Sequence, residues 1–285
     1  MNIIHQNQKE KSVLVEFQSD FCNTTKIMGI INVTPDSFYD GGKYSKSLKD
    51  TIQHAIKLIN DGADILDVGG ESSRPGAKPV SETEEIDRII PIIEAIRDQS
   101  DIPISVDTYK SKVAQYALKA GANWINDISG LRFDDEMIKV AAEHNCPVVI
   151  MHMQGTPLSM QLNPKYDNVV SELLEFFDER IVYLNQNNIN NIIIDPGIGF
   201  GKTLNHNLEI LNHIEKFKKF GLPVLVGVSR KSFIGTILNE TVENRISGSL
   251  AALSWLAIKG VDIVRVHDVM ESVNAIKIIN SIKQK

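Results

Sequence analysis

Residues 102–126 have the sequence IPISVDTYKSKVAQYALKAGANWIN and contain one complete strand–helix–strand unit. The unit begins with the short β-rich run Ile102–Val106 and ends with a second run, Asn123–Asn126. Between the two runs, apolar residues recur at the spacing of one helix face: Val113, Tyr116, Ala117 and Ala120. Gly121 follows this stretch, at the position where a helix C-terminus favours glycine. The segment therefore predicts a βαβ unit, the building block of parallel sheets.

The same unit recurs along the whole chain. We expect eight strands, at Lys26–Ile31, Asp64–Val68, Ile102–Val106, Asn123–Asn126, Pro147–Met151, Asn191–Ile194, Leu222–Val226 and Asp262–Val266. Gly62, Gly221 and Gly260 follow helical stretches as Gly121 does. Eight such units without a linker predict an α/β fold, a single closed (β/α)8 barrel. An open, doubly wound parallel sheet is the alternative.

The barrel domain is expected over residues 26–285, preceded by an extension of residues 1–25. Val13, Val15 and Phe17 alternate in this extension, which favours a short strand or hairpin that caps the barrel. Three connections after strands are long, the first, second and seventh of the barrel: Val33–Tyr44, Gly69–Ser81 and Arg230–Thr241. Long βα loops of a barrel usually belong to its active site.

Composition and charge exclude several classes of protein. Of 285 residues, 42% are hydrophobic and 23% are charged, as in ordinary globular proteins. No apolar run approaches the length of a membrane span, and the first residues lack the pattern of a signal peptide. A net charge of −6 argues against nucleic-acid binding. We expect Cys22 and Cys146 to be reduced thiols, and the protein to be cytoplasmic.

Polar side chains stand at almost every predicted strand end, where barrels carry their chemistry. They are Asn32, Glu71, Ser73, Arg74, Asp107, Asn126, His152, Asp195, Ser229, Arg230, Lys231, Arg265 and His267. Lys231, Arg265 and His267 follow the last two strands, a common phosphate site. Asp107, Asn126 and Asp195 suit a flat ligand with paired N–H donors, and they favour positive charge nearby. Asn32 is a neutral oxygen ligand for Mg²⁺ that arrives with phosphates.

Structural alternatives exist for these residues, and some familiar motifs are absent. Loop capping would explain the two aspartates, and surface ion pairing would explain Lys231. The glycine-rich stretch 197–203 lacks the first glycine of a phosphate-binding P-loop, because Pro196 stands there, and its Lys202 breaks a dinucleotide-binding pattern. The residues alone thus favour a planar, nitrogen-rich ligand that carries a phosphorylated group, with Mg²⁺ bound alongside.

Eight segments, in order and each at a predicted strand end, resemble the dihydropteroate synthase family of folate biosynthesis. They are Met28–Phe38, Asp67–Ala77, Ser105–Thr108, Asn126–Gly130, Met151–Pro157, Asp195–Lys202, Ser229–Phe233 and Arg265–Asp268. The resemblance covers the chain from about Lys26 to its end. It implies an enzyme that condenses 6-hydroxymethyl-7,8-dihydropterin diphosphate with 4-aminobenzoate, giving 7,8-dihydropteroate and diphosphate. An arylamine is a modest nucleophile at neutral pH without any dedicated base, so we expect a dissociative displacement without a covalent intermediate. The absence of an evident nucleophile–base pair is consistent with this.

The resemblance also implies roles for residues. The pterin pocket would contain Asp107, Asn126, Asp195 and Lys231. The diphosphate would bind Asn32, Ser73, Arg265 and His267, with Asn32 as the Mg²⁺ ligand. The 4-aminobenzoate pocket and its loops would contain Pro35, Asp36, Phe38, Arg74, Pro75, Phe200, Lys231 and Ser232. Catalysis would fall to Asp107, Lys231, Arg265 and His267. Sulfonamides compete for the 4-aminobenzoate pocket across the family, and its members are usually homodimers.

Two other functions share this pattern. A non-catalytic paralogue would keep the pterin pocket, but it should lose Asp36, Arg74 or Lys231, all of which are present. A pterin-dependent methyltransferase barrel would share the pocket without needing Arg265 and His267. Ser73 stands where the family more often has threonine, which keeps the hydroxyl group and removes a methyl group.

Overall fold

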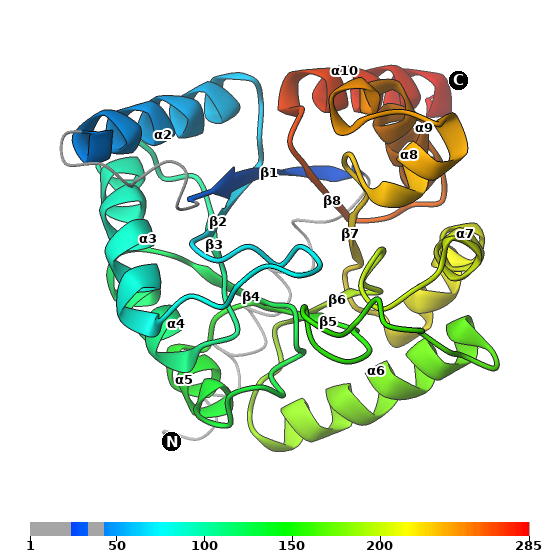
Figure 1. Cartoon of the computed structure of the whole chain (residues 1–285), viewed down its shortest axis with the longest axis horizontal. Coiled ribbons are helices and arrows are strands. Elements are labelled where there is room, and N and C mark those ends of the chain that lie inside the picture. Colours follow the sequence, from blue (N-terminus) through cyan, green and yellow to red (C-terminus); the bar gives the residue numbers. More distant parts are fainter. Residues whose placement is uncertain (1–23, 34–42, 285) are drawn as a thin grey trace, which may run out of the picture.

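A computed structural model describes residues 24–33 and 43–284 of the chain. Short strands alternate with helices along these residues (Figure 1). The elements are β1 (Lys26–Asn32), α2 (Lys43–Asn60), β2 (Ile65–Gly69), α3 (Glu82–Arg97), β3 (Ile104–Asp107), α4 (Ser111–Lys119), β4 (Trp124–Asp127), α5 (Glu136–His144), β5 (Val148–Met151), α6 (Val169–Gln186), β6 (Ile192–Asp195), α7 (Leu204–Asn212), the 3₁₀ helix η2 (Ile214–Phe220), β7 (Leu225–Gly227), α8 (Ser232–Leu238), the 3₁₀ helix η3 (Val242–Asn244), α9 (Ile246–Ile258), β8 (Ile263–Val266) and α10 (Val269–Lys283).

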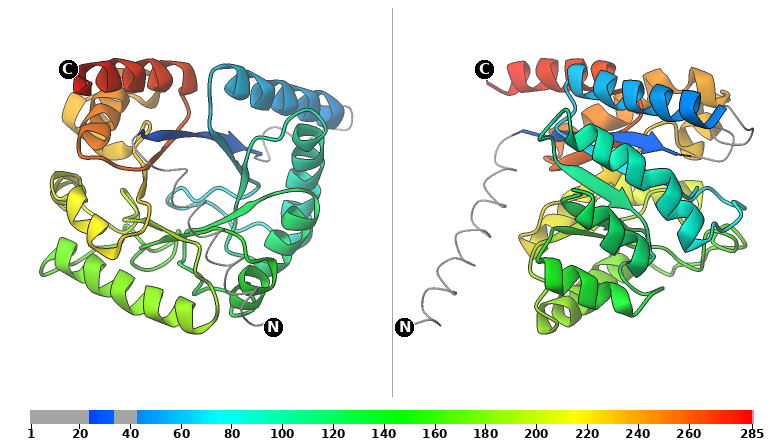
Figure 2. Two further views of the ribbon diagram at one scale, coloured as in Figure 1. Left: turned by 180° about the vertical axis from the view of Figure 1, so that it is seen from behind. Right: turned by 90° about the vertical axis from the view of Figure 1, so that its left-hand side faces the viewer.

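The eight strands form one parallel sheet in the order β6-β5-β4-β3-β2-β1-β8-β7. A parallel bridge between Ile194 of β6 and Val224, which directly precedes β7, joins the two ends of this order. The helices surround the strands on the outside, as the two opposite views show (Figures 1 and 2). The predicted (β/α)8 barrel is therefore confirmed, and the open, doubly wound sheet is excluded.

Alternation along the strands builds two separate cores. An inner layer of buried side chains fills the barrel, one from each of seven strands: Met28, Ile65, Trp124, Val149, Ile193, Leu225 and Ile263. Their neighbours, such as Leu66, Ile192 and Val264, belong to a larger outer core that includes helix residues such as Phe177. Since successive residues of a strand point to opposite faces, a residue two positions after an inner-layer residue also points into the barrel.

The observed strands match the predicted ones to within three residues. The largest shift is in β7, which begins at Leu225 rather than Leu222. Pro223 has no N–H to donate to a ladder, and the N–H of Val224 donates to the Asp262 carboxylate at 2.8 Å instead of to a strand. The pairing of β7 with β8 therefore starts at Leu225.

The connection after β7 differs from the predicted loop Arg230–Thr241, because it contains α8. Phe233 and Ile234 bury their side chains and hold this short helix against the barrel. Arg245 separates the next two helices, η3 and α9. Residues 1–23 of the predicted extension lie outside the described residues, so the strand or hairpin there stays a prediction. No helix in the described ranges 24–33 and 43–284 is long and apolar enough to cross a membrane.

Candidate active site

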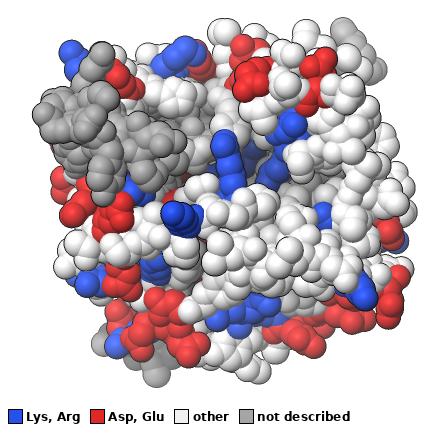
Figure 3. All heavy atoms as spheres, viewed as in Figure 1, with Lys and Arg blue, Asp and Glu red and all other residues white. Residues whose placement is uncertain are grey.

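Polar side chains enter the barrel directly above the inner layer. Asp67, Asn126, Asp195 and Arg265 each lie two residues after an inner-layer residue of the same strand. Strand alternation therefore turns all four side chains inward, toward the carboxyl ends of the strands. This is the end of the barrel where active sites form. Figure 3 shows Lys and Arg side chains gathered around a hollow in the middle of this face.

Arg265 joins two of the carboxylates. Its Nε donates to Asp67 Oδ2 at 2.5 Å, and its second terminal nitrogen donates to Asp107 Oδ2 at 2.8 Å. Asn126 Nδ2 donates to the same Asp67 oxygen at 3.1 Å. Asp67 is fully buried, and its other oxygen accepts no hydrogen bond from the described residues. The charge of Asp67 therefore depends on Arg265 and Asn126 for its stabilisation.

Burial and charge set the ionisation of this group. Burial raises the pKa of Asp107, and the nearby Arg265 opposes that rise. Burial also works to lower the pKa of Arg265, but the charges of Asp67 and Asp107 outweigh it, so the pKa is raised. The guanidinium thus stays charged at any working pH, while Asp107 is easier to protonate than an exposed aspartate.

Asp195, at the end of β6, faces a second cationic group. Its Oδ1 accepts a hydrogen bond from the Gly197 N–H at 2.8 Å. Burial raises the pKa of Asp195 to about 6, against the lowering effects of the Gly197 hydrogen bond and of Lys231. Lys231 Nζ lies 4.2 Å from the centre of the Phe200 ring. Burial lowers the pKa of Lys231 to about 8, so it is largely protonated at neutral pH.

An ion pair and a glycine fix the turns that carry Lys231 and Phe200. Arg230 has a positive φ of 55°, and its guanidinium binds the Asp268 carboxylate through two hydrogen bonds of 2.9 and 2.7 Å. This ion pair holds the turn that carries Lys231. On the other side, Gly197 has a φ of 69°, and a Cβ there would lie 2.1 Å from the His152 carbonyl oxygen. The loop before Phe200 therefore requires glycine at residue 197.

His267 follows β8 and binds Ser229. Its Nδ1 lies 3.0 Å from Ser229 Oγ, which also accepts from the His267 backbone N–H at 3.2 Å. Burial and the neighbouring Arg265 lower the pKa of His267 to about 4. At neutral pH, His267 is therefore an uncharged imidazole that can donate one hydrogen bond. The Ser229 hydroxyl can donate to Nδ1, which leaves the ring proton on Nε2.

The comparisons with known proteins agree on one family. The family model described as pterin binding enzyme matches residues 28–267. The dihydropteroate synthase of Clostridium beijerinckii is 48% identical over 264 residues, which cover 92% of this chain and 95% of the relative. The chain belongs to the dihydropteroate synthase family.

Solved structures of this family have the same fold. The Yersinia pestis dihydropteroate synthase in a sulfonamide drug complex has a TM-score of 0.87 and 43% identity, and the match covers 92% of this chain and 95% of that one. The Xanthomonas albilineans dihydropteroate synthase in complex with 7,8-dihydropteroate has a TM-score of 0.83 and 39% identity, with the same coverage. These matches favour the synthase over the binding paralogue and the methyltransferase.

The barrel brings most of the predicted site residues of a dihydropteroate synthase together. Asp107, Asn126, Arg265 and His267 lie at the inner rim, while Lys231 and Asp195 are close enough to shift each other's pKa. Ser232 is the exposed first residue of α8. Ser73, Arg74 and Pro75 lie on the loop between β2 and α3. Asn32 ends β1 and is exposed. Pro35, Asp36 and Phe38 lie outside the described residues.

Two buried residues at the rim of this family member were not predicted as site residues. Asp67 lies inside β2 rather than at its end. The sequence signal for its inward position is its place two residues after Ile65. Lys202 was noted only as part of a failed motif. Its ammonium group is buried and lies 3.1 Å from His152 Nδ1, and it donates to the carbonyl oxygens of His152 and Phe200 at 3.1 and 3.0 Å.

Proposed function

We propose that the chain condenses 6-hydroxymethyl-7,8-dihydropterin diphosphate with 4-aminobenzoate, giving 7,8-dihydropteroate and diphosphate. The observation that carries this proposal is the inner rim, where Asp107, Asn126, Asp195 and Arg265 converge from four strands. A pterin presents a guanidine-like edge with paired N–H donors, which ionised Asp195 and the Asn126 amide can bind. The family and the product bound to the Xanthomonas albilineans relative support the same assignment.

The reaction breaks the bond between the pterin methylene and the diphosphate oxygen, and the electron pair leaves with diphosphate. The methylene cation is conjugated with the pterin ring, and the negative charge of Asp107 stabilises it. The amine of 4-aminobenzoate then forms the new C–N bond and loses a proton to solvent or to diphosphate. Lys231 and the Nε2–H of neutral His267 bind anionic oxygens, while Arg265 adds fixed positive charge.

Mg²⁺ fits the first strand end. Asn32 offers one neutral amide oxygen at the exposed end of β1, and the described residues contain no cluster of three His, Cys, Asp or Glu that could cage a metal ion. Mg²⁺ keeps several waters and is usually held by one or two protein ligands together with substrate phosphates. Asn32 would therefore hold the ion, which would help to neutralise charge on the leaving diphosphate.

The decisive experiment measures diphosphate release from the pterin diphosphate, with Mg²⁺ or with EDTA, and with or without 4-aminobenzoate. We expect release together with 7,8-dihydropteroate only when Mg²⁺ and 4-aminobenzoate are both present, and a sulfonamide should compete with 4-aminobenzoate. A chain that binds the pterin but releases no diphosphate under any condition would be a binding paralogue. Full turnover in EDTA would remove the Mg²⁺ assignment alone.

Pterin binding should weaken in acid. The pKa of Asp195 is raised to about 6, so the carboxylate that binds the pterin N–H donors is protonated as the pH falls through that value. Affinity at pH 5 should be about tenfold lower than at pH 7, as expected for one proton. Titration calorimetry with 6-hydroxymethyl-7,8-dihydropterin measures this. Asp195→Asn should bind weakly with a flat profile; a variant that keeps the wild-type slope would place the titration elsewhere.

We propose that the chain forms a homodimer. A groove of about 390 Å³ lies where α7, α8 and α9 meet, lined by Leu208, Phe233, Ile237, Ala252 and Trp255 among others. Ile237 is 55% exposed and Trp255 is 42% exposed, although both are large apolar side chains. Apolar surface of this kind favours a self-complementary contact between two copies. Sedimentation equilibrium should give twice the chain mass, and Ile237→Glu should give the monomer. A wild-type monomer at micromolar concentrations would contradict the proposal.

A further inference from the structure

The loop between β2 and α3 crosses the mouth of the barrel. It carries Ser73 and Arg74, and its tip binds the connection after β5 through a hydrogen bond of 3.3 Å from the Gly76 N–H to the Pro157 carbonyl oxygen. Arg74 is exposed on this loop. Its charge is among the smaller effects that lower the pKa of His267, behind burial and the charge of Arg265. The loop thus carries two predicted site residues that do not belong to the strands of the barrel.

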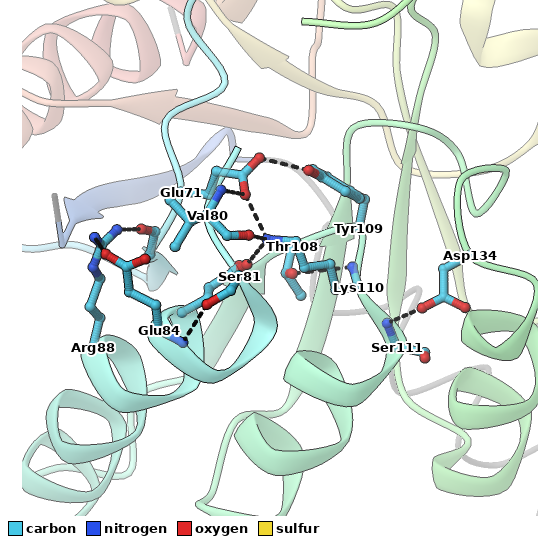
Figure 4. A network of polar contacts seen from close by, with 12 residues as sticks. Glu71, Val80, Ser81, Glu84, Arg88, Thr108, Tyr109, Lys110, Ser111 and Asp134 are labelled. Atoms are coloured by element: carbon cyan, nitrogen blue, oxygen red, sulfur yellow. Dashed lines mark hydrogen bonds and ion pairs between the residues drawn. The ribbon is translucent and has the colours of Figure 1, made fainter. Parts of the chain in front are cut away.

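Both ends of this loop are tied to one lysine (Figure 4). Lys110 Nζ donates to Glu71 Oε2, to the Val80 carbonyl oxygen and to Glu85 Oε2, each at 2.6 Å. Glu71 opens the loop and Val80 stands near its end. These three acceptors match the three protons of the ammonium group. We call Lys110, Glu71, Val80, Glu85 and Tyr109 the stem clamp.

Glu71 closes the stem a second time. Its Oε2 accepts from the Val80 N–H at 2.9 Å, and its Oε1 accepts from the Tyr109 hydroxyl at 2.7 Å. The Glu71, Lys110 and Glu85 side chains are 11%, 12% and 1% exposed. Because the contacts are charge-assisted and shielded from water, they hold the stem more firmly than a surface ion pair could.

The pKa of Lys110 also indicates that the stem clamp is stable. Burial works to lower the pKa of Lys110, but its hydrogen bonds to Glu71 and Glu85 outweigh it and raise that pKa. Lys110 is therefore fully charged at working pH. Burial raises the pKa of Glu85, and Lys110 opposes that rise. Without the ammonium group, the Glu71 and Glu85 carboxyl groups would lose the cation between them.

The stem clamp also connects the loop to the strand that carries Asp107. Lys110 follows Asp107 by three residues, and Asp107 pairs in register with Gly69, two residues before Glu71. The loop stem and the strand end of Asp107 are thus held as one unit. Of the four residues predicted for the pterin pocket, only Asp107 lies next to the stem clamp. Asn126 and Asp195 lie on other strands, and Lys231 directly precedes α8.

We propose that Lys110 is a positioning residue for the second substrate. It holds the two ends of the loop together, so that Ser73 and Arg74 arrive at the site in the geometry that 4-aminobenzoate and the leaving diphosphate require. The inference rests on the proposed function. Loss of the clamp should lower turnover and raise KM for 4-aminobenzoate while pterin affinity stays unchanged.

Lys110→Met tests this, with Lys112→Met as the matched control. Lys110 directly precedes α4, and Lys112 lies in the first turn of that helix; its side chain is 53% exposed, and its ion pair to Glu82 is 3.7 Å long. For Lys110→Met we expect kcat/KM for 4-aminobenzoate to fall by about tenfold or more. Hydrogen exchange of a peptide covering residues 70–81 should rise, and Kd for 6-hydroxymethyl-7,8-dihydropterin should change less than about twofold. Lys110→Arg should recover part of the loss, and Lys112→Met should match wild type.

Three results would overturn the proposal: unchanged KM and kcat in Lys110→Met, unchanged exchange over residues 70–81, or loss of pterin affinity in parallel with activity. If Lys110→Met does not fold, Tyr109→Phe removes only the hydrogen bond to Glu71 and is measured in the same way, with a smaller shift in the same direction. If the wild-type chain makes no dihydropteroate, the proposed function fails, and the exchange data still decide whether Lys110 holds the loop.

Discussion

Replacing Arg265 by Met should lower kcat/KM by about a thousandfold or more and destabilise the fold by about 3–5 kcal/mol. Arg265 binds Asp67 at 2.5 Å and Asp107 at 2.8 Å, and Asp67 is fully buried. Removing the guanidinium leaves both carboxylates in a low-dielectric interior without their cation. The site also loses a fixed positive charge beside the leaving diphosphate. Urea unfolding and steady-state kinetics measure the two effects separately.

Two control variants separate the geometry of the Arg265 guanidinium from its charge. Arg265→Lys keeps one positive charge but cannot bind both carboxylates in the same geometry, so it should recover stability only in part and activity very little. The double variant Asp67→Asn with Arg265→Met removes one buried charge of each sign, and it should regain much of the stability without regaining activity. Equal recovery of both would mean that Arg265 is only structural.

The fold was predictable from the sequence because the β-rich runs, the helical spacing of apolar residues and the glycines after helices all indicate the same βα units. Residues 102–126 contain a β-rich run, an amphipathic helical stretch and a second β-rich run, and the structure has β3, α4 and β4 there. The sequence did not predict the start of β7 or the helix α8. Pro223 delays the start of β7, and the burial of Phe233 and Ile234 stabilises a helix of seven residues that is too short for a periodic signal.

The candidate site was predictable where a polar residue ends a strand, as with Asp107, Asp195 and His267. It was not predictable where the partner is distant in sequence. Asp67 lies 198 residues from Arg265, and nothing local shows that the two meet. His267 is neutral because burial and the charge of Arg265 lower its pKa. The sequence around a histidine that follows a strand does not show this protonation state. If His267 binds diphosphate as predicted, it does so as a neutral hydrogen-bond donor.

The Asp107→Asn variant should lower kcat by about a hundredfold to a thousandfold with pterin affinity changed only a few-fold. The asparagine oxygen can still accept the 2.8 Å hydrogen bond from Arg265, so the geometry should persist while the negative charge is lost. Asp195, Asn126 and Lys231 remain to hold the pterin ring. The loss should therefore fall on formation of the methylene cation, the step at which charge develops.

Isotope scrambling observes that step directly. When the methylene–oxygen bond of the pterin diphosphate breaks reversibly, the diphosphate stays bound and rotates. An ¹⁸O label in the bridging position then exchanges with the non-bridging oxygens before the bond re-forms. Wild type with Mg²⁺ and no 4-aminobenzoate should scramble the label, and Asp107→Asn should scramble it more slowly by the same factor as its loss in kcat. Calorimetry with 6-hydroxymethyl-7,8-dihydropterin provides the binding control. Normal binding together with full turnover and scrambling in the variant would exclude Asp107 as the group that stabilises the cation, and Lys231 and the diphosphate itself would then have to set the rate of departure.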